Sequence, residues 1–173
     1  MDQQLYDAVN NEPIEKIAAL IRKGASVNYV TSAYQDTPLF RAATRGDAGI
    51  VTMLLDSSAN PNVTNKFGTT PLHSAAWQGS EGSVAALLSR QANVDSVNRD
   101  NETALHMAAK KDHRSIVQQL LQRGANYQIR DVLLLLRLLL LRGLLEMPVC
   151  RSDWRLTNHQ WALCSVLSVC VVH

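Results

Sequence analysis

Two histidines and a short glycine- and serine-rich segment are the residues of this chain whose types and spacing could do chemistry. His73 and His106 are 33 residues apart and could share a metal ion, but Phe40 occupies the corresponding earlier position and supplies no third ligand. Segment 79–83, GSEGS, resembles a phosphate-binding loop but lacks the lysine that follows one. The chain has no GxxxxGK, GxGxxG, HExxH or CxxC motif. We therefore expect no catalytic residue, cofactor, metal site or small-molecule substrate.

The three cysteines, Cys150, Cys164 and Cys170, all lie beyond residue 131. Cys164 and Cys170 are six residues apart, which is neither a zinc-ligand spacing nor an i, i+4 helical pair. The first three quarters of the chain contain no thiol, so a disulfide-built scaffold is excluded there. We assign the cysteines no site.

The histidines have a structural interpretation when the elements that position them are considered. Each histidine comes three residues after a threonine, Thr70 or Thr103, where a capping-box side chain reaches back to the start of a helix. Thr37 stands at the corresponding earlier position. Proline follows two of the three threonines and suits the first position of a helix, where its missing N–H costs nothing. We therefore predict that a helix begins after each threonine.

These helix starts belong to a repeat of 33 residues. Five residues past each threonine comes a pair of alanines, whose small side chains let neighbouring helices approach closely. A valine and two leucines follow at i, i+3 and i+4, the stripe of a second helix that is buried on one side. These triplets are Val51/Leu54/Leu55, Val84/Leu87/Leu88 and Val117/Leu120/Leu121. The pattern predicts two helices per repeat.

A degenerate copy of the same pattern precedes the three clear ones. Ala8 and Val9 lead to Ile17, Leu20 and Ile21 at the same offsets. This copy lacks the threonine-proline start and begins with polar residues, as expected for an end repeat whose outer face meets water. We expect four repeats, approximately at residues 1–31, 32–64, 65–97 and 98–131, in one domain of residues 1–131.

Glycines stand where most of these helices should end in a left-handed turn. Gly46 and Gly79 can end the first helix of a repeat, and Gly24 and Gly124 the second. Ser58, Gln91 and Asp112 replace glycine at the remaining equivalent positions. Each of the three is expected to bear strain of about 1 kcal/mol if it keeps a positive φ.

The repeated residues resemble the ankyrin repeat family, whose unit of about 33 residues carries a TPLHxA signature. Segment 70–75, TPLHSA, reproduces that signature, and segments 37–42 and 103–108 each differ from it once. The resemblance covers residues 1 to about 131. It implies an all-α solenoid of stacked helix-turn-helix repeats with short projecting turns. It also implies a non-catalytic module that binds a protein partner through the turn tips and the inner helices.

The partner-binding residues are expected at the positions that do not repeat, because repeated positions are used by the scaffold. These positions are Tyr34, Asp36, Thr44, Arg45, Lys66, Phe67, Thr69, Trp77, Gln78, Arg99, Asp100, Glu102, Lys110 and Lys111. The sequence alone does not identify the partner that they would bind.

Trp77 and Phe67 are the strongest candidates, since exposed aromatic side chains often anchor interfaces. A packing role is equally open for Trp77, which could fold over Lys110 of the next repeat or cover the groove between repeats. The basic side chains of Lys110, Lys111, His113 and Arg114 could attract an acidic partner or simply form a solvated turn.

Charge and targeting signals narrow the class of protein. The chain has 173 residues, with 17 lysines and arginines against 15 aspartates and glutamates, so its net charge of +2 does not support nucleic acid as a partner. The N-terminus lacks the basic and apolar regions of a secretory signal. We therefore expect an intracellular protein, in the cytoplasm or the nucleus.

The tail, residues 132–173, departs abruptly from the repeat. It opens with a leucine-rich stretch that Arg137 and Arg142 interrupt, so a membrane-spanning helix is not expected. Our hypothesis is that the tail derives from an alternative exon, a shifted frame or a mispredicted gene end. A leucine-rich helix could cover the last repeat, or its exposed leucines could cause self-association or membrane adhesion. Two alternatives to a protein-binding module therefore stay open: a membrane-associated scaffold anchored by the tail, and a truncated product without independent function.

Overall fold

The computed structural model describes residues 1–126, and within this range it contains eight helices and no strand. The helices are α1 (Asp2–Asn11), α2 (Ile14–Arg22), α3 (Pro38–Arg45), α4 (Ala48–Asp56), α5 (Pro71–Gln78), α6 (Glu81–Ser89), α7 (Ala104–Lys110) and α8 (Arg114–Gln122). The all-α prediction is confirmed. The expectations for the tail and for the end of the fourth repeat, residues 127–131, lie outside the described residues.

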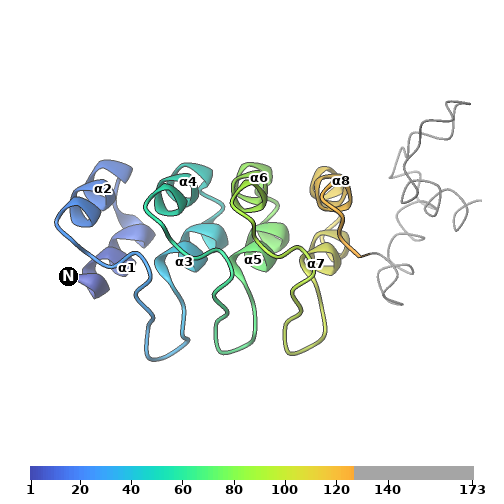
Figure 1. The fold of residues 1–173 in the computed structure, drawn as a ribbon, viewed down its shortest axis with the longest axis horizontal. Coiled ribbons are helices and arrows are strands. Elements are labelled where there is room, and N and C mark those ends of the chain that lie inside the picture. Colours follow the sequence, from blue (N-terminus) through green and yellow to red (C-terminus); the bar gives the residue numbers. More distant parts are fainter. Residues whose placement is uncertain (127–173) are drawn as a thin grey trace, which may run out of the picture.

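The eight helices form two parallel layers of four (Figure 1). One layer contains the inner helices α1, α3, α5 and α7, and the other contains the outer helices α2, α4, α6 and α8. Three loops project beyond the inner layer between successive helix pairs. We call their ends finger 1 (residues 31–36), finger 2 (residues 65–69) and finger 3 (residues 98–102). This arrangement is the predicted solenoid.

Local hydrogen bonds set the helix starts at the predicted residues. The Thr37 hydroxyl accepts from the Phe40 N–H at 3.1 Å, and Pro38 occupies the first position of α3. The outer helices are capped by shorter polar side chains, because Asp47 Oδ1 accepts from Ile50 N–H at 3.0 Å to begin α4. Each helix pair is therefore defined by side chains at its own starts.

The core runs continuously through all four helix pairs. Val51, Val84 and Val117 are completely buried at equivalent positions of α4, α6 and α8. Leucines and paired alanines of the inner helices complete this core. Because each helix buries its apolar stripe against neighbouring pairs, the stability of one repeat depends on the repeats beside it.

The helix ends adopt the left-handed turns that the sequence predicts. Gly46 and Gly79 have φ angles of 74° and 84° after α3 and α5. The residues that replace glycine also keep a positive φ, with 68° at Ser58, 60° at Gln91 and 59° at Asp112. Each of these three side chains therefore carries strain of about 1 kcal/mol.

Candidate functional site

Fingers 2 and 3 are shaped by the side chain of their first residue. Asn65 Oδ1 accepts from the backbone N–H groups of Phe67 and Thr69 at 2.9 and 3.1 Å. Asn98 Oδ1 accepts in the same way from Asp100 and Glu102, at 2.9 Å each. These bonds close each loop on itself. The tips therefore stand at fixed positions relative to the inner helices.

Finger 1 is one residue longer and uses a different first residue. Thr31 Oγ1 accepts from Asp36 N–H at 3.0 Å, and the Thr31 carbonyl accepts from Gln35 N–H at 3.0 Å. Thr31 thus replaces the asparagine of fingers 2 and 3. The 33-residue phase of the sequence gives no indication of this extra residue.

The three fingers are joined to one another by backbone hydrogen bonds. Lys66 of finger 2 donates its N–H to the Tyr34 carbonyl of finger 1 at 3.0 Å. Arg99 of finger 3 donates to the Phe67 carbonyl of finger 2, also at 3.0 Å. The fingers therefore form one continuous array. Together with the exposed residues of the inner helices, they make up a surface that we call the finger face.

Three aromatic side chains of the finger face are half exposed to solvent. Tyr34 is 53% exposed, Phe67 51% and Trp77 47%, which makes them the most exposed aromatic residues of the described chain. Tyr34 and Phe67 occupy equivalent positions at the tips of fingers 1 and 2, and Trp77 lies near the end of α5. All three are among the residues predicted to bind a partner.

Lysines cover part of each aromatic ring. The Lys66 ammonium lies 3.9 Å from the centre of the Tyr34 ring and 5.1 Å from that of Phe67. The Lys111 ammonium lies 3.9 Å from the centre of the Trp77 ring. The sequence suggested Lys110 as the packing partner of Trp77, and the structure corrects this: Lys111 follows the end of α7 and reaches back over the ring, while Lys110 binds Glu102.

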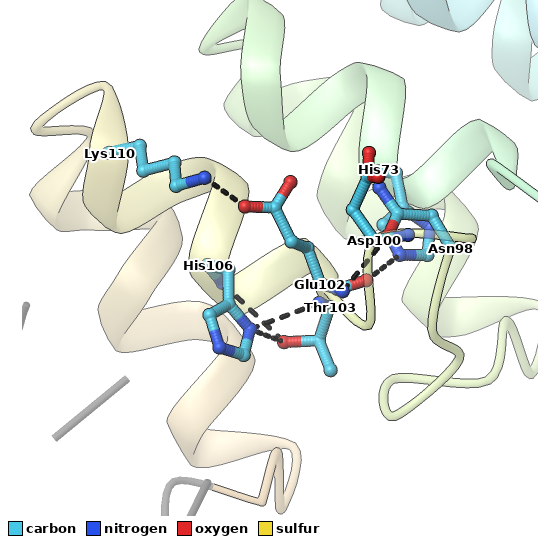
Figure 2. Close-up of polar contacts among 7 residues, drawn as sticks. All are labelled: His73, Asn98, Asp100, Glu102, Thr103, His106 and Lys110. Atoms are coloured by element: carbon cyan, nitrogen blue, oxygen red, sulfur yellow. Dashed lines mark hydrogen bonds and ion pairs between the residues drawn. The ribbon is translucent and has the colours of Figure 1, made fainter. Parts of the chain in front are cut away.

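An open hollow of about 400 Å³ lies between finger 3, α5 and α7. The predicted residues that line it are Thr44, Thr69, Trp77, Gln78, Asp100, Glu102 and Lys110. Figure 2 shows its polar side, where the Lys110 ammonium pairs with the Glu102 carboxylate. His73 Nε2 donates to the Glu102 carbonyl at 2.9 Å, which ties finger 3 to α5. The hollow is therefore bounded by an aromatic ring, an ion pair and the carboxylate of Asp100.

The two histidines serve as helix caps, as the sequence predicts. His73 Nδ1 accepts from Thr70 N–H at 3.2 Å, and His106 Nδ1 accepts from Thr103 N–H at 3.0 Å. Burial lowers the pKa of His73, although the Glu102 and Ser96 carbonyls and the Glu102 charge oppose that effect. Among residues 1–126, no three His, Cys, Asp or Glu side chains are arranged to hold a metal ion.

Asp36 is the one predicted binding residue that the structure buries, with 8% of its surface exposed. The Tyr6 hydroxyl of α1 donates to its carboxylate at 3.5 Å. Burial raises the pKa of Asp36, and the Asn65 side chain and the charges of Arg41 and Lys66 act against this rise. Asp36 therefore supports the base of finger 1 from within.

The remaining predicted residues lie along the inner helices and finger 3. Thr44 and Arg45 are exposed on α3, where Thr44 Oγ1 donates to the Phe40 carbonyl at 3.0 Å and the Arg45 guanidinium donates to the Val9 carbonyl. Gln78 and Arg99 are exposed on α5 and finger 3. The structure thus brings residues from three repeats onto one face.

Sequence reasoning missed several residues of this face. Ser74 and Met107 line the hollow, and Arg41 occupies the equivalent position on α3. Arg41 Nε also donates to Asn10 Oδ1 of α1, which joins the first two inner helices. The 33-residue steps from Arg41 to Ser74 to Met107 are the signal that could have found them.

Within the range that the structure describes, no helix has the length and apolarity needed to span a bilayer. The prediction of a tail-anchored scaffold concerns residues that lie outside this range.

Comparison with known proteins identifies the family. The sequence pattern described as "Ankyrin repeats (3 copies)" matches residues 5–98 and again residues 58–131. No curated protein matches the chain. The two matches together cover well over half of its length, and they coincide with the helix pairs and fingers described above. The chain therefore belongs to the ankyrin repeat family.

Proposed function

We propose that this chain is an adaptor, scaffold or inhibitor that binds a protein partner through its finger face and performs no catalysis. Ankyrin repeats are generally protein–protein interaction modules, and the family is generally non-catalytic. The observation that carries the proposal is the presence of three half-exposed aromatic side chains, Tyr34, Phe67 and Trp77, on this one face.

Exposed aromatic rings of this size are suited to anchoring an interface. A large ring gains free energy when its remaining apolar surface leaves water, at about 25 cal/mol per Å². Aromatic residues accordingly dominate the binding energy of many interfaces. The fingers hold Tyr34 and Phe67 in place through their backbone bonds, so little conformational freedom remains to be lost on binding.

The proposed binding unit is the repeat domain, residues 1–131, with repeats at approximately 1–31, 32–64, 65–97 and 98–131. The proposed contact residues are the predicted positions of the finger face. Asp36 takes part indirectly, by supporting finger 1. Thr69, Asp100, Glu102 and Lys110 would contact the partner where it enters the hollow beside Trp77.

The test is affinity capture with the full chain and with matched alanine variants. We expect a double variant, Phe67→Ala with Trp77→Ala, to lose most captured proteins, because removal of an anchor costs about 2 kcal/mol or roughly thirtyfold in affinity. Ile14→Ala is the control, since Ile14 is 39% exposed on the outer helix α2. The proposal fails if the aromatic variant captures the same proteins as the wild type. It also fails if the control loses them equally.

A further inference from the structure

We infer that the partner segment bound by the finger face is acidic, with apolar side chains placed next to its carboxylates. This inference rests on the proposed function and specifies the chemistry of the partner. It derives from the distribution of charge on the face and from the pairing of lysines with aromatic rings.

The finger face carries positive charge that the described residues do not neutralise by ion pairing. Residues 1–126 contain twelve basic and twelve acidic side chains, so this part of the chain as a whole is balanced. The basic side chains of the face that make no salt bridge within this range are Arg41, Arg45, Lys66, Arg99 and Lys111. Three of the four ion pairs present join Lys16 to Glu12, Arg90 to Asp56 and Arg114 to Asp112, all away from the fingers.

The acidic residues of the same face do not cancel this excess. Glu102 is already paired with Lys110, and Asp36 is buried beneath finger 1. Asp100 at the tip of finger 3 and Asp7 on α1 are the exposed acidic groups of the fingers and inner helices apart from the start of α1. Five cations without ion pairs therefore face two exposed carboxylates. A complementary partner segment must carry net negative charge.

The aromatic rings hold two of the lysines without neutralising them. The Lys66 ammonium lies against Tyr34 and Phe67 and also donates to the Ala33 carbonyl at 3.3 Å. The Lys111 ammonium lies over Trp77. A cation held against a ring keeps its full charge and retains N–H groups for a further acceptor. A carboxylate that binds there meets a donor whose position is largely set.

The same pairing determines where apolar groups of the partner must lie. About half of the surface of Tyr34, Phe67 and Trp77 is still open to solvent beside the bound lysines. A carboxylate that reaches Lys66 or Lys111 therefore brings its neighbouring residues against an aromatic ring. Acidic residues that alternate with apolar ones satisfy both parts of the surface, whereas a purely acidic run leaves the rings exposed.

A nucleic acid strand could also combine negative charge with flat rings, but the face fits it less well. Its phosphate backbone would pass the carboxylates of Asp100 and Glu102, which repel it. The described residues as a whole are also electrically balanced, so they exert no long-range attraction on a polyanion. These observations favour a protein segment.

The experiment is selection of random displayed peptides on the immobilised full chain, followed by affinity measurement of the enriched peptides. We expect enriched peptides to be net acidic and to contain aromatic or aliphatic residues next to aspartate or glutamate. Charge reversal by Lys66→Glu with Lys111→Glu should weaken their binding about a hundredfold, since each lost charge-assisted contact costs roughly tenfold. Arg22→Glu with Lys23→Glu, which reverses two charges at the end of the outer helix α2, should change binding less than about twofold.

Three results would overturn the inference: enriched peptides that are neutral or basic, equal losses in the two charge-reversal variants, or the absence of any enriched peptide. A poly-deoxythymidine strand that binds the face more tightly than the enriched peptides would replace a protein segment by nucleic acid and would also overturn it. The Trp77→Ala variant separates the two proposals. Neutral peptides that depend on Trp77 contradict only the acidic chemistry, while peptides indifferent to both Trp77 and Phe67 contradict the finger face itself.

Discussion

Replacement of His73 by phenylalanine tests how the repeats are held together. Phe40 occupies the equivalent position on α3, so the phenylalanine ring is compatible with this fold. In the wild type, the His73 ring bonds to Thr70 N–H at 3.2 Å, to the Thr70 hydroxyl at 2.8 Å and to the Glu102 carbonyl at 2.9 Å. Phenylalanine makes none of these bonds.

The expected cost at neutral pH follows from those bonds. Each contributes about 1 kcal/mol, and the buried Thr70 N–H that loses its acceptor adds a penalty of about 1–3 kcal/mol. The greater apolar surface of phenylalanine offsets part of this loss. We expect His73→Phe to lower the free energy of unfolding by about 2–4 kcal/mol, measured by urea denaturation at pH 7.5.

The same variant should change the pH dependence of stability. Burial lowers the pKa of His73 in the folded protein below its ordinary value of 6.5, so the unfolded chain binds more protons in the interval between the two values. The contribution of neutral His73 is therefore fully present above pH 6.5 and is lost as the pH falls below it. This group can remove at most about 1.4 kcal/mol per pH unit.

Urea denaturation of the wild type and of His73→Phe at pH 7.5 and pH 5.5 provides the comparison. The wild type should lose more stability between the two pH values than the variant, because only the wild type contains the buried histidine at this position. Parallel losses in both proteins would refute the reasoning. Should the phenylalanine variant fail to fold, His73→Gln retains a hydrogen-bonding side chain without a group that titrates in this range.

Two further predictions concern the left-handed helix ends. Gln91→Gly should raise the free energy of unfolding by about 0.5–1 kcal/mol in urea denaturation, because it relieves the strain at φ 60° at the entropic cost of glycine; a destabilised variant would contradict the strain. Gly79→Ala should lower it by about 2–3 kcal/mol, since an added Cβ would lie 2.6 Å from His113 Cε1 and disturb the bond from His113 Nε2 to the Trp77 carbonyl. Gly24→Ala, where a Cβ meets no atom within 4 Å, is the control and should lose only about 1–2 kcal/mol.

The scaffold could be predicted from the sequence because its determinants are local and repeated. The threonine at each inner-helix start and the valine of each outer helix recur every 33 residues, and each has the same environment in every copy. The strained ends at Ser58, Gln91 and Asp112 were predictable for the same reason, since glycine at the equivalent positions revealed the backbone conformation. Repetition thus supplies in one sequence the comparison that otherwise requires several.

The details of the finger face could be predicted only in part, because they depend on choices between neighbouring side chains. Lys110 and Lys111 are adjacent and equally basic, and the end of α7 between them determines which one reaches Trp77 and which reaches Glu102. The burial of Asp36 follows from the extra residue in finger 1, which the repeat spacing conceals. Such outcomes require the positions of the neighbouring elements as well as the residue types.

The bonds that stabilise the stack are also the bonds that position the finger face. His73 caps α5 through Thr70 and, with its other nitrogen, holds the Glu102 carbonyl of finger 3. His113 packs over Gly79 and binds the Trp77 carbonyl. A partner that binds Trp77 and finger 3 together therefore contacts elements of two repeats that already restrain each other. Binding should consequently stabilise α5 and α7 as a unit, which couples recognition at the finger face to the cohesion of neighbouring repeats.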